Sequence, residues 1–304
     1  MNKIIRIGTR DSELALWQAH TVEKKLNALG YKTEIVAVKS TGDMVLDVPL
    51  YELGITGIFT KTLDIAMLKG EVDIAVHSMK DVPTALPKGI VQAAVLPRAN
   101  EQDILVHKGS LDFLHSAGTI ATGSLRRQAQ WLNRYPQHQV NDLRGNVNTR
   151  LQKLKDSNWD GAIFALAGLQ RINLLPENYT LLDWMIPAPA QGAMVVVALE
   201  NDDHTIEALN QLNDRESDIC THIEREFLKT LEGGCTAPIG AIAKIDNNKN
   251  IRFEGVLLSI DGKEKIYIEK VIPYHSYKDF GKQCAEEVLN NGGTEIMEKI
   301  KSTS

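Results

Sequence analysis

The feature that most constrains the fold of this chain is a regular alternation of strand-like and helix-like segments along its first two thirds. Lys3–Gly8 has the pattern of a short strand, and residues 12–29 follow with apolar side chains at helical spacing. Thr33–Val38 and the apolar run Val72–Val76 predict further strands, with a helix predicted between them at about residues 60–69. Strands that alternate with helices in this way favour a parallel sheet with helices on both faces.

A second unit of the same kind follows. Its predicted strands lie at residues 104–107, 119–122, 140–143 and 162–166, and its predicted helices begin at Ser124 and near Val147. The apolar run Met194–Leu199 comes after this unit has used its own elements, so we expect it to return to the first sheet. The sequence therefore predicts two doubly wound α/β domains, formed by residues 1–98 with 194–214 and by residues 99–193.

The character of the sequence changes after residue 214. A long helix is predicted from Arg215 to about Leu231, and three strands are predicted at residues 239–245, 251–260 and 265–272. The turns between these strands are short, which favours an antiparallel meander. With a final helical region expected from about Tyr277 to Lys301, residues 215–304 predict a small C-terminal α+β domain with an antiparallel sheet.

Composition excludes several classes of protein. Of the 304 residues, 43% are hydrophobic and 24% charged, and the net charge of -5 argues against a nucleic-acid partner. No apolar stretch is long enough for a signal peptide or a membrane span, so we expect a cytoplasmic protein without a membrane partner. The 3 cysteines are odd in number and lack a C-x-x-C pair, which predicts neither a disulfide framework nor a metal site.

Two neighbouring arginines stand at the start of a predicted helix. Arg126 and Arg127 follow Ser124 directly after a strand, where free backbone N–H groups and the helix dipole favour an anion. Two guanidinium groups sharpen that preference for a carboxylate or a phosphate. The alternative, for any single arginine, is a solvated surface side chain with a weak ion pair.

The same arrangement recurs at other junctions between a strand and a helix. Arg144 ends a strand before a glycine turn, and Arg150 lies inside the helix that follows. Arg10 stands at a third junction and Arg171 at a weaker fourth. Because ligands bind at the carboxyl ends of strands in open α/β sheets, the pattern predicts a site for a polyanionic small molecule. Neither a P-loop nor a dinucleotide fingerprint is present.

A polar segment leaves the predicted strand Val72–Val76, with the sequence His77-Ser78-Met79-Lys80-Asp81-Val82-Pro83. Asp81 lies beside a lysine at the carboxyl end of the strand, a position suited to an acid, a base or a charge stabiliser. The alternative is a turn aspartate that bonds its own backbone before the proline.

The cysteines differ in their surroundings. Cys235 follows Gly233-Gly234 in a loop that would give a thiol access to solvent, although free cysteines are more often buried and inert. Cys220 and Cys284 lie inside helical patterns, and for these two we expect the inert role.

Five segments, taken together, resemble the hydroxymethylbilane synthase (porphobilinogen deaminase) family. They are Thr9–Leu16, His77–Pro83, Gly123–Arg127, Leu143–Arg150 and Gly233–Cys235. The segments occur in the order of the family and span nearly the whole chain. One of them alone would be weak evidence, whereas five in register are specific.

The resemblance implies a three-domain enzyme, with two domains related to the periplasmic binding protein fold and a C-terminal domain that carries the cofactor. It implies a dipyrromethane cofactor joined to Cys235 by a thioether, and Asp81 as the catalytic residue. The residues that match cofactor contacts are Ser12, Lys80, Thr122, Ser124, Arg126, Arg127, Arg144 and Gly145. Those that match substrate contacts are Arg10, Arg150 and Arg171.

The implied reaction joins four porphobilinogen molecules head to tail into hydroxymethylbilane, in tetrapyrrole and haem biosynthesis. Each porphobilinogen carries two carboxylates, so a growing chain calls for several arginines. Loss of ammonia gives an azafulvene-type cation, which Asp81 is placed by the resemblance to stabilise. The family expectation is a monomer.

Three positions depart from the family pattern. Thr56 stands for a lysine in the loop Gly54–Gly57, Thr62 for an acidic residue, and Ala190 for a glycine. If that glycine needs a positive φ, the crossover between the domains must differ here. The stretch Thr41–Gly57 is a candidate lid, on its length and glycine content.

Two other classes of function remain open. A non-catalytic carboxylate-binding protein of the two-lobed type would explain the arginines without chemistry. A phosphate-handling α/β transferase is the more remote alternative. Only the synthase predicts a stable adduct of two pyrrole rings on the purified protein, so its intact mass separates the three.

Overall fold

The structure, a computed structural model, describes residues 3–38, 60–232 and 237–303. These residues divide into two compact units. The first unit holds residues 3–38, 60–99 and 192–218, and the second holds residues 100–191, 219–232 and 237–303. None of the helices in these ranges combines the length and the apolar character needed to cross a membrane.

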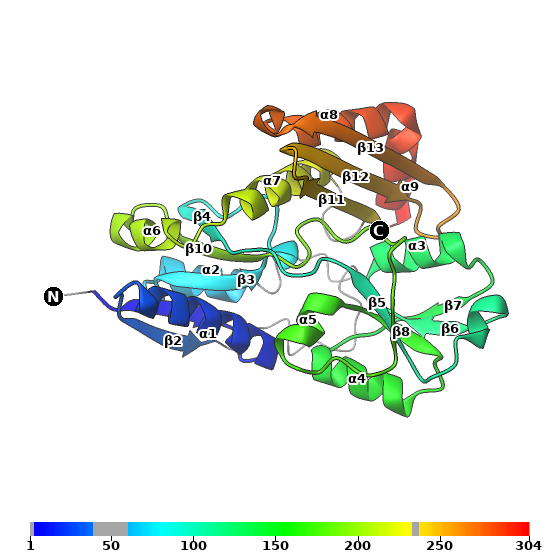
Figure 1. Ribbon diagram of the computed structural model, residues 1–304, viewed down its shortest axis with the longest axis horizontal. Helices are drawn as coiled ribbons and strands as arrows, with labels where there is room; N and C mark the ends of the chain where they lie inside the picture. Colours follow the sequence, from blue (N-terminus) through cyan, green and yellow to red (C-terminus); the bar gives the residue numbers. More distant parts are fainter. Residues whose placement is uncertain (1–2, 39–59, 233–236, 304) are drawn as a thin grey trace. The chain divides into compact units, whose positions relative to one another are not determined.

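The first unit is built on a five-stranded sheet with the order β2-β1-β3-β10-β4 (Figure 1). Its strands are β1 (Ile5–Thr9), β2 (Thr33–Ala37), β3 (Ile74–Ser78), β4 (Ile90–Val95) and β10 (Met194–Leu199). The expected return of the apolar run at 194–199 is confirmed, since β10 pairs with both β3 and β4. Strands β1, β2 and β3 are parallel, as expected, whereas β10 runs antiparallel to its two neighbours.

Helices cover both faces of this sheet. They are α1 (Glu13–Ala28), α2 (Lys61–Leu68) and α6 (Asp203–Asn210). Alternate strand residues such as Ile7 and Val76 pack with α1 and α6 into one apolar cluster. Gly8 points the other way, because a Cβ atom there would meet Leu63 of α2 at 3.2 Å. The core therefore lies in two layers on either side of the strands.

The second unit contains a sheet of the same design, with the order β7-β6-β8-β5-β9. Its strands are β5 (Asp103–His107), β6 (Thr119–Ala121), β7 (Gln139–Asn141), β8 (Gly161–Ala165) and β9 (Tyr179–Leu181), and its helices are α3 (Leu125–Arg134), α4 (Val147–Asp156) and α5 (Leu166–Arg171). Strands β6, β7 and β8 are parallel, whereas β5 is antiparallel to β8. In the order given for each sheet, the fourth strand runs antiparallel to the others. This strand is β10 in the first unit and β5 in the second.

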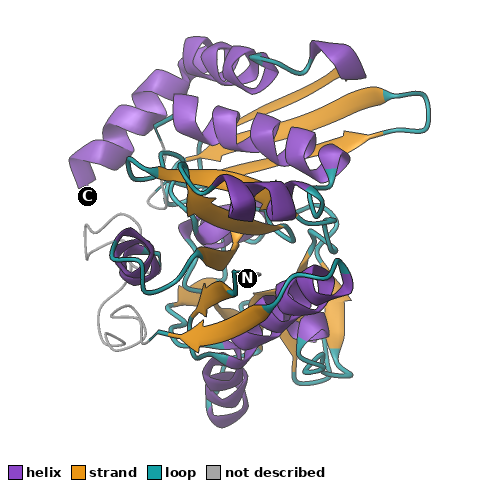
Figure 2. Ribbon diagram, turned by 90° about the vertical axis from the view of Figure 1, so that its left-hand side faces the viewer, coloured by secondary structure: helices purple, strands orange, loops and turns teal. Residues whose placement is uncertain are grey.

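The C-terminal part of the second unit forms a separate sheet with helices packed on it (Figures 1 and 2). Its elements are α7 (Arg215–Thr230), which begins in the first unit, β11 (Ile239–Ile245), β12 (Asn250–Leu258), β13 (Lys265–Pro273), α8 (Phe280–Val288) and α9 (Thr294–Thr303). The predicted antiparallel meander is confirmed. Its core includes Phe227 and Phe253, with ring centroids 5.1 Å apart.

The final helical region, expected from about Tyr277 to Lys301, consists of two helices. A π-type turn at Leu289–Gly293 separates α8 from α9. Within it Gly292 has φ 99°, a left-handed value that glycine adopts without the clash of a Cβ atom. The Gly-Gly pair therefore breaks the helix and turns its second half.

Candidate functional site

The carboxyl ends of β1 and β3 bring together the predicted site residues of the first unit. These strands are parallel neighbours, so the residues that follow them lie at the same edge of the sheet. Arg10 follows β1, while Lys80 and Asp81 lie in the short helix η2 (Met79–Asp81) that follows β3. Asp81 is exposed, and Ser12 precedes helix α1 as its N-cap.

His77, near the end of β3, belongs to the motif His77–Pro83, but the sequence analysis assigned it no role. His77 is buried, and its Nε2 atom has no hydrogen-bond partner among the described residues. Burial, reinforced by the positive charge of Arg10, lowers the pKa of His77 to about 4. The imidazole is therefore neutral at neutral pH, so His77 adds no positive charge beside Arg10.

Two junctions between a strand and a helix lie side by side in the second unit. Strands β6 and β7 are parallel neighbours, and the N–H of Thr122 donates to the carbonyl of Asn141 over 2.9 Å. Gly123 passes so close to the other junction that a Cβ atom there would lie 2.6 Å from the carbonyl oxygen of Leu143. The motif glycine is therefore required by a close approach of two backbones. That approach brings Ser124 and Arg144 to one edge of the sheet.

Both arginines at the start of α3 are buried. Arg126 is 4% exposed and Arg127 is 5% exposed, so the surface alternative is wrong for these two residues. Asp103, which is completely buried, accepts from Arg127 Nη2 at 2.7 Å and forms an ion pair with Arg126 Nη1 at 2.8 Å. Gln191 also donates to this carboxylate, at 2.9 Å.

The charges of this cluster dominate its electrostatics. Burial alone would raise the pKa of Asp103, but the positive charges of Arg126 and Arg127 lower it to about 2. Burial also lowers the pKa of Arg126, against the attraction of Asp103, but arginine remains protonated. One carboxylate against two guanidinium groups leaves one positive charge in the cluster. The amino end of α3 adds partial positive charge at the same place.

Sequence reasoning missed Asp103. Its position follows from topology: β5 is antiparallel to β8, so Asp103 at the start of β5 pairs with Ala165 at the end of β8. The residue therefore lies at the edge where the parallel strands end. The available signal was a charged residue that directly precedes the apolar run Ile104–Val106.

The remaining predicted arginines follow the other parallel strands of this sheet. Arg144 is buried, and Arg150 in α4 donates through Nε to the carbonyl of Gly145 at 2.7 Å. Gly145 has φ 114°, so the turn that Arg150 holds is one that favours glycine. Arg171 ends α5 after β8, and burial lowers its pKa to about 10. The sheet thus gathers the predicted residues of this unit at one edge.

The departure at residue 190 does not remove the positive φ. Ala190 has φ 63° and is completely buried, so the alanine adopts the conformation that the family's glycine would allow. Its N–H donates to the buried carboxylate of Glu224 at 2.6 Å. Glu224 lies on the buried face of α7, and the sequence analysis did not single it out.

The predicted attachment cysteine, one of the departures from the family pattern and the candidate lid lie outside the described residues. These are Cys235, Thr56 and the whole of the candidate lid, Thr41–Gly57. Cys220 and Cys284 are buried, as expected for inert thiols. Burial raises the pKa of Cys284 to about 12, which removes its thiolate at neutral pH.

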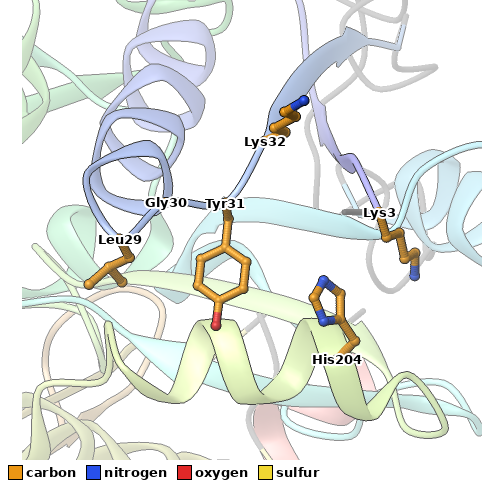
Figure 3. Close-up of a pocket in the computed structure, with 6 residues that line it drawn as sticks. All are labelled: Lys3, Leu29, Gly30, Tyr31, Lys32 and His204. Atoms are coloured by element: carbon orange, nitrogen blue, oxygen red, sulfur yellow. The ribbon is translucent and has the colours of Figure 1, made fainter. Parts of the chain in front are cut away.

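A small pocket lies in the first unit, away from the residues predicted for the site (Figure 3). It measures about 110 Å³ and is lined by Lys3, Leu29, Gly30, Tyr31, Lys32 and His204. Lys3 and Lys32 precede β1 and β2, so the pocket lies at the opposite edge of the sheet from Arg10. Lys3 already forms an ion pair with Asp202 at 2.6 Å. None of the predicted site residues lines this pocket.

Two solved structures resemble part of the chain in their backbone. One is an ancestral cationic amino acid solute binding protein, with a TM-score of 0.45, 16% identity, and coverage of 69% of this chain and 87% of that chain. Another is the BvgS periplasmic VFT2 domain of Bordetella pertussis, with a TM-score of 0.43, 13% identity, and coverage of 69% and 86%.

Sequence comparisons identify one family. Residues 5–207 match the family model "Porphobilinogen deaminase, dipyromethane cofactor binding domain", and residues 219–290 match "Porphobilinogen deaminase, C-terminal domain". The porphobilinogen deaminase of Campylobacter fetus subsp. fetus (strain 82-40) is 41% identical over 300 residues, which cover 98% of both chains. The chloroplastic porphobilinogen deaminase of Oryza sativa subsp. japonica is 41% identical over 98% of this chain and 87% of its own length. The chain belongs to the porphobilinogen deaminase family.

Proposed function

We propose that this chain is a hydroxymethylbilane synthase, a transferase that condenses four porphobilinogen molecules into a linear tetrapyrrole with loss of ammonia. The observation that carries the proposal is family membership over nearly the full length, at 41% identity to a curated porphobilinogen deaminase. The reaction belongs to tetrapyrrole and haem biosynthesis.

The second unit has the electrostatics needed to hold the carboxylates of a dipyrromethane cofactor. Its arginine cluster keeps one positive charge after the pairing with Asp103, and the buried Nε of Arg126 has no partner among the described residues. A carboxylate of the cofactor would offset this positive charge and would accept a hydrogen bond from Nε of Arg126. We assign the cofactor's carboxylates to this edge, with Thr122, Ser124, Arg126, Arg127, Arg144 and Gly145 as contacts. Ser12 and Lys80 of the first unit are assigned as further cofactor contacts.

The chemistry requires a negative charge beside the reacting pyrroles. When bound, the cofactor supplies the pyrrole carbon to which the first substrate is joined. We assign two roles to Asp81. It stabilises the positive charge that develops as ammonia leaves, and it assists the transfer of the proton that is lost afterwards. Arg10, Arg150 and Arg171 are assigned to the carboxylates of the substrate. The exposure of Asp81 supports this assignment.

We further propose that the cofactor is joined to Cys235 by a thioether. The burial of Cys220 and Cys284 supports this choice, because a thiol buried in apolar surroundings is a poor nucleophile. The proposal includes three domains, residues 1–98 with 194–214, residues 99–193 and residues 215–304. It also includes a cytoplasmic monomer that requires no metal, nucleic acid or membrane.

Intact mass and turnover test the function on the same preparation. The purified chain should carry the added mass of two pyrrole rings on Cys235 and should convert porphobilinogen to hydroxymethylbilane. The Cys235→Ser variant should fold but lack both the adduct and the activity, because only a thiol forms the thioether. Cys220→Ser is the matched control and should keep both. An adduct mapped to Cys220 or Cys284 would contradict the assignment.

The second candidate function is a carboxylate-binding protein without chemistry. The arginine cluster favours it as much as it favours the synthase, since both bind carboxylates. The two differ in mass and turnover: a binding protein carries no covalent adduct and leaves porphobilinogen unchanged. A wild-type chain with those two properties would replace the proposed function.

A further inference from the structure

We propose that Asp103 is a positioning residue of the cofactor site: one buried carboxylate fixes two guanidinium groups in the orientation in which they meet the cofactor's carboxylates. This inference rests on the proposed function, because it takes those carboxylates to be the ligand of Arg126 and Arg127. It concerns the support of the site rather than the site's own contacts.

The position of Asp103 needs an explanation of this kind. It lies at the edge of the sheet where the parallel strands end, next to Ala165 in the strand register. A carboxylate at this edge would repel an anionic ligand if it faced that ligand. Asp103 is instead completely buried, and its oxygens face the arginines. The residue therefore acts through the arginines and does not compete for their ligand.

Arg127 is held by three hydrogen bonds to two acceptors. Its Nε and Nη2 donate to Asp103 Oδ1 at 3.0 and 2.7 Å, and its Nη1 donates to the carbonyl of Ile163 at 3.1 Å. Arg126 is held through Nη1, which lies 2.8 Å from Asp103 Oδ2 and donates to the carbonyl of Ile186 at 2.7 Å. These contacts fix both side chains before any ligand arrives, and such preorganisation keeps donors aimed at a bound group.

The charge of the cluster shows why one carboxylate serves two arginines. Two cations at the amino end of a helix repel each other and are disfavoured by the helix dipole. Asp103 offsets this repulsion but leaves one positive charge, together with the unpartnered Nε of Arg126. A second carboxylate would neutralise the site, and none at all would leave the arginines free to turn toward solvent. The single aspartate therefore gives a site that is both fixed and cationic.

The Asp103→Asn variant of the full chain tests the proposal. Asparagine keeps the size of the side chain but removes the charge that holds the arginines. We expect the fraction of folded chains that carry the two-ring adduct on Cys235, read by intact mass, to fall about tenfold or more. In the remaining loaded enzyme we expect KM for porphobilinogen to change less than the adduct fraction.

Asp160→Asn is the matched control in the same domain. Asp160 accepts the N–H of Thr119 at 2.8 Å, so its loss lowers stability through an ordinary structural contact. The control should lower the melting temperature and leave the adduct fraction at the wild-type value. If Asp103→Asn behaves in the same way, Asp103 is merely structural and the proposal is wrong.

A second pair of variants covers the case in which Asp103→Asn does not fold. The double variant Asp103→Asn with Arg127→Met restores the single positive charge of the wild type but leaves Arg126 without its carboxylate. Although the cluster has no net positive charge in Arg127→Met alone, we expect the double variant to load less cofactor, because the pair of Asp103 and Arg126 survives only in the single variant. Equal loading would overturn the proposal. A wild-type chain without an adduct would contradict the proposed function itself.

Discussion

The buried carboxylate of Glu224 accepts a 2.6 Å hydrogen bond from the N–H of Ala190, a residue with the left-handed φ of 63°. The other oxygen of Glu224 accepts the N–H of Ala243 at 2.8 Å. One side chain of α7 thus ties the segment before β10 to strand β11. A left-handed backbone costs an L-residue about 1–2 kcal/mol, so these contacts hold a conformation that the alanine itself disfavours.

Substitution of Ala190 tests this account. Ala190→Gly relieves the backbone cost but removes a buried methyl group worth about 0.8 kcal/mol, so the free energy of unfolding should change by less than about 1 kcal/mol. Ala190→Val places a β-branched side chain at positive φ in a buried site and should lower it by at least ~2 kcal/mol. Urea denaturation of both variants measures the difference. Equal stability of the valine and glycine variants would show that φ at this position is relaxed in solution.

Gly123→Ala should separate the two junctions of the second sheet. Its Cβ would lie 2.6 Å from the Leu143 carbonyl oxygen, so one backbone must move. We expect a loss of stability of about 1–3 kcal/mol and a rise in KM, because Ser124 and Arg144 no longer keep their spacing. Gly30→Ala is the control: Gly30 has φ +89° and open space around it, so that variant should lose stability without a change in KM. An unchanged KM in Gly123→Ala would refute the link between this approach and the site.

The neutral His77 predicts a dependence of stability on pH. Unfolded chains take up a proton as the pH falls through 6.5, whereas folded His77 takes it up only near 4. Between these values the unfolded state binds more protons, so the stability contributed by His77 is present above pH 6.5 and is lost as the pH falls toward 4. The loss should amount to at most about 3 kcal/mol.

His77→Gln should flatten this part of the stability curve, measured by urea denaturation at several pH values between 6.5 and 4. The exposed His20 provides the control, and His20→Gln should keep the wild-type slope. If His77→Gln keeps the wild-type slope as well, another group accounts for the dependence.

Local patterns were sufficient for much of the fold and for the placement of the arginines. The alternation of strands and helices predicted both sheets, and the order of strand, turn and helix predicted that Arg126 and Arg144 lie at carboxyl ends. Pairing between distant strands was beyond the reach of such patterns. The antiparallel direction of β5, which carries Asp103 to the site, depends on which strands it contacts, and no local spacing encodes that choice. Arg126 and Arg127 are buried against Asp103, so their burial could not be predicted from local patterns either.

The last prediction concerns Asp81 and separates catalysis from a structural role. The competing explanation is a turn aspartate that bonds its own backbone before Pro83. In the structure Asp81 is exposed in the short helix η2, which favours a role toward a ligand.

Asp81→Asn keeps the size of the side chain but removes the negative charge that would face the cation formed as ammonia leaves. Because this interaction strengthens as the charge develops, the loss should appear in kcat, by about 10² to 10³-fold, with a smaller change in KM. The variant should carry its cofactor and melt at the wild-type temperature, since the side chain of Asp81 is exposed. Asp81→Glu keeps the charge but displaces it by one methylene group, so its kcat should lie between wild type and Asn.

A turn aspartate predicts the reverse, with a lower melting temperature in both variants and a near-normal kcat for the folded protein. Measurement of kcat, adduct mass and melting temperature on the same preparations decides between them, and a stable, loaded Asp81→Asn enzyme with wild-type kcat would remove Asp81 from the mechanism.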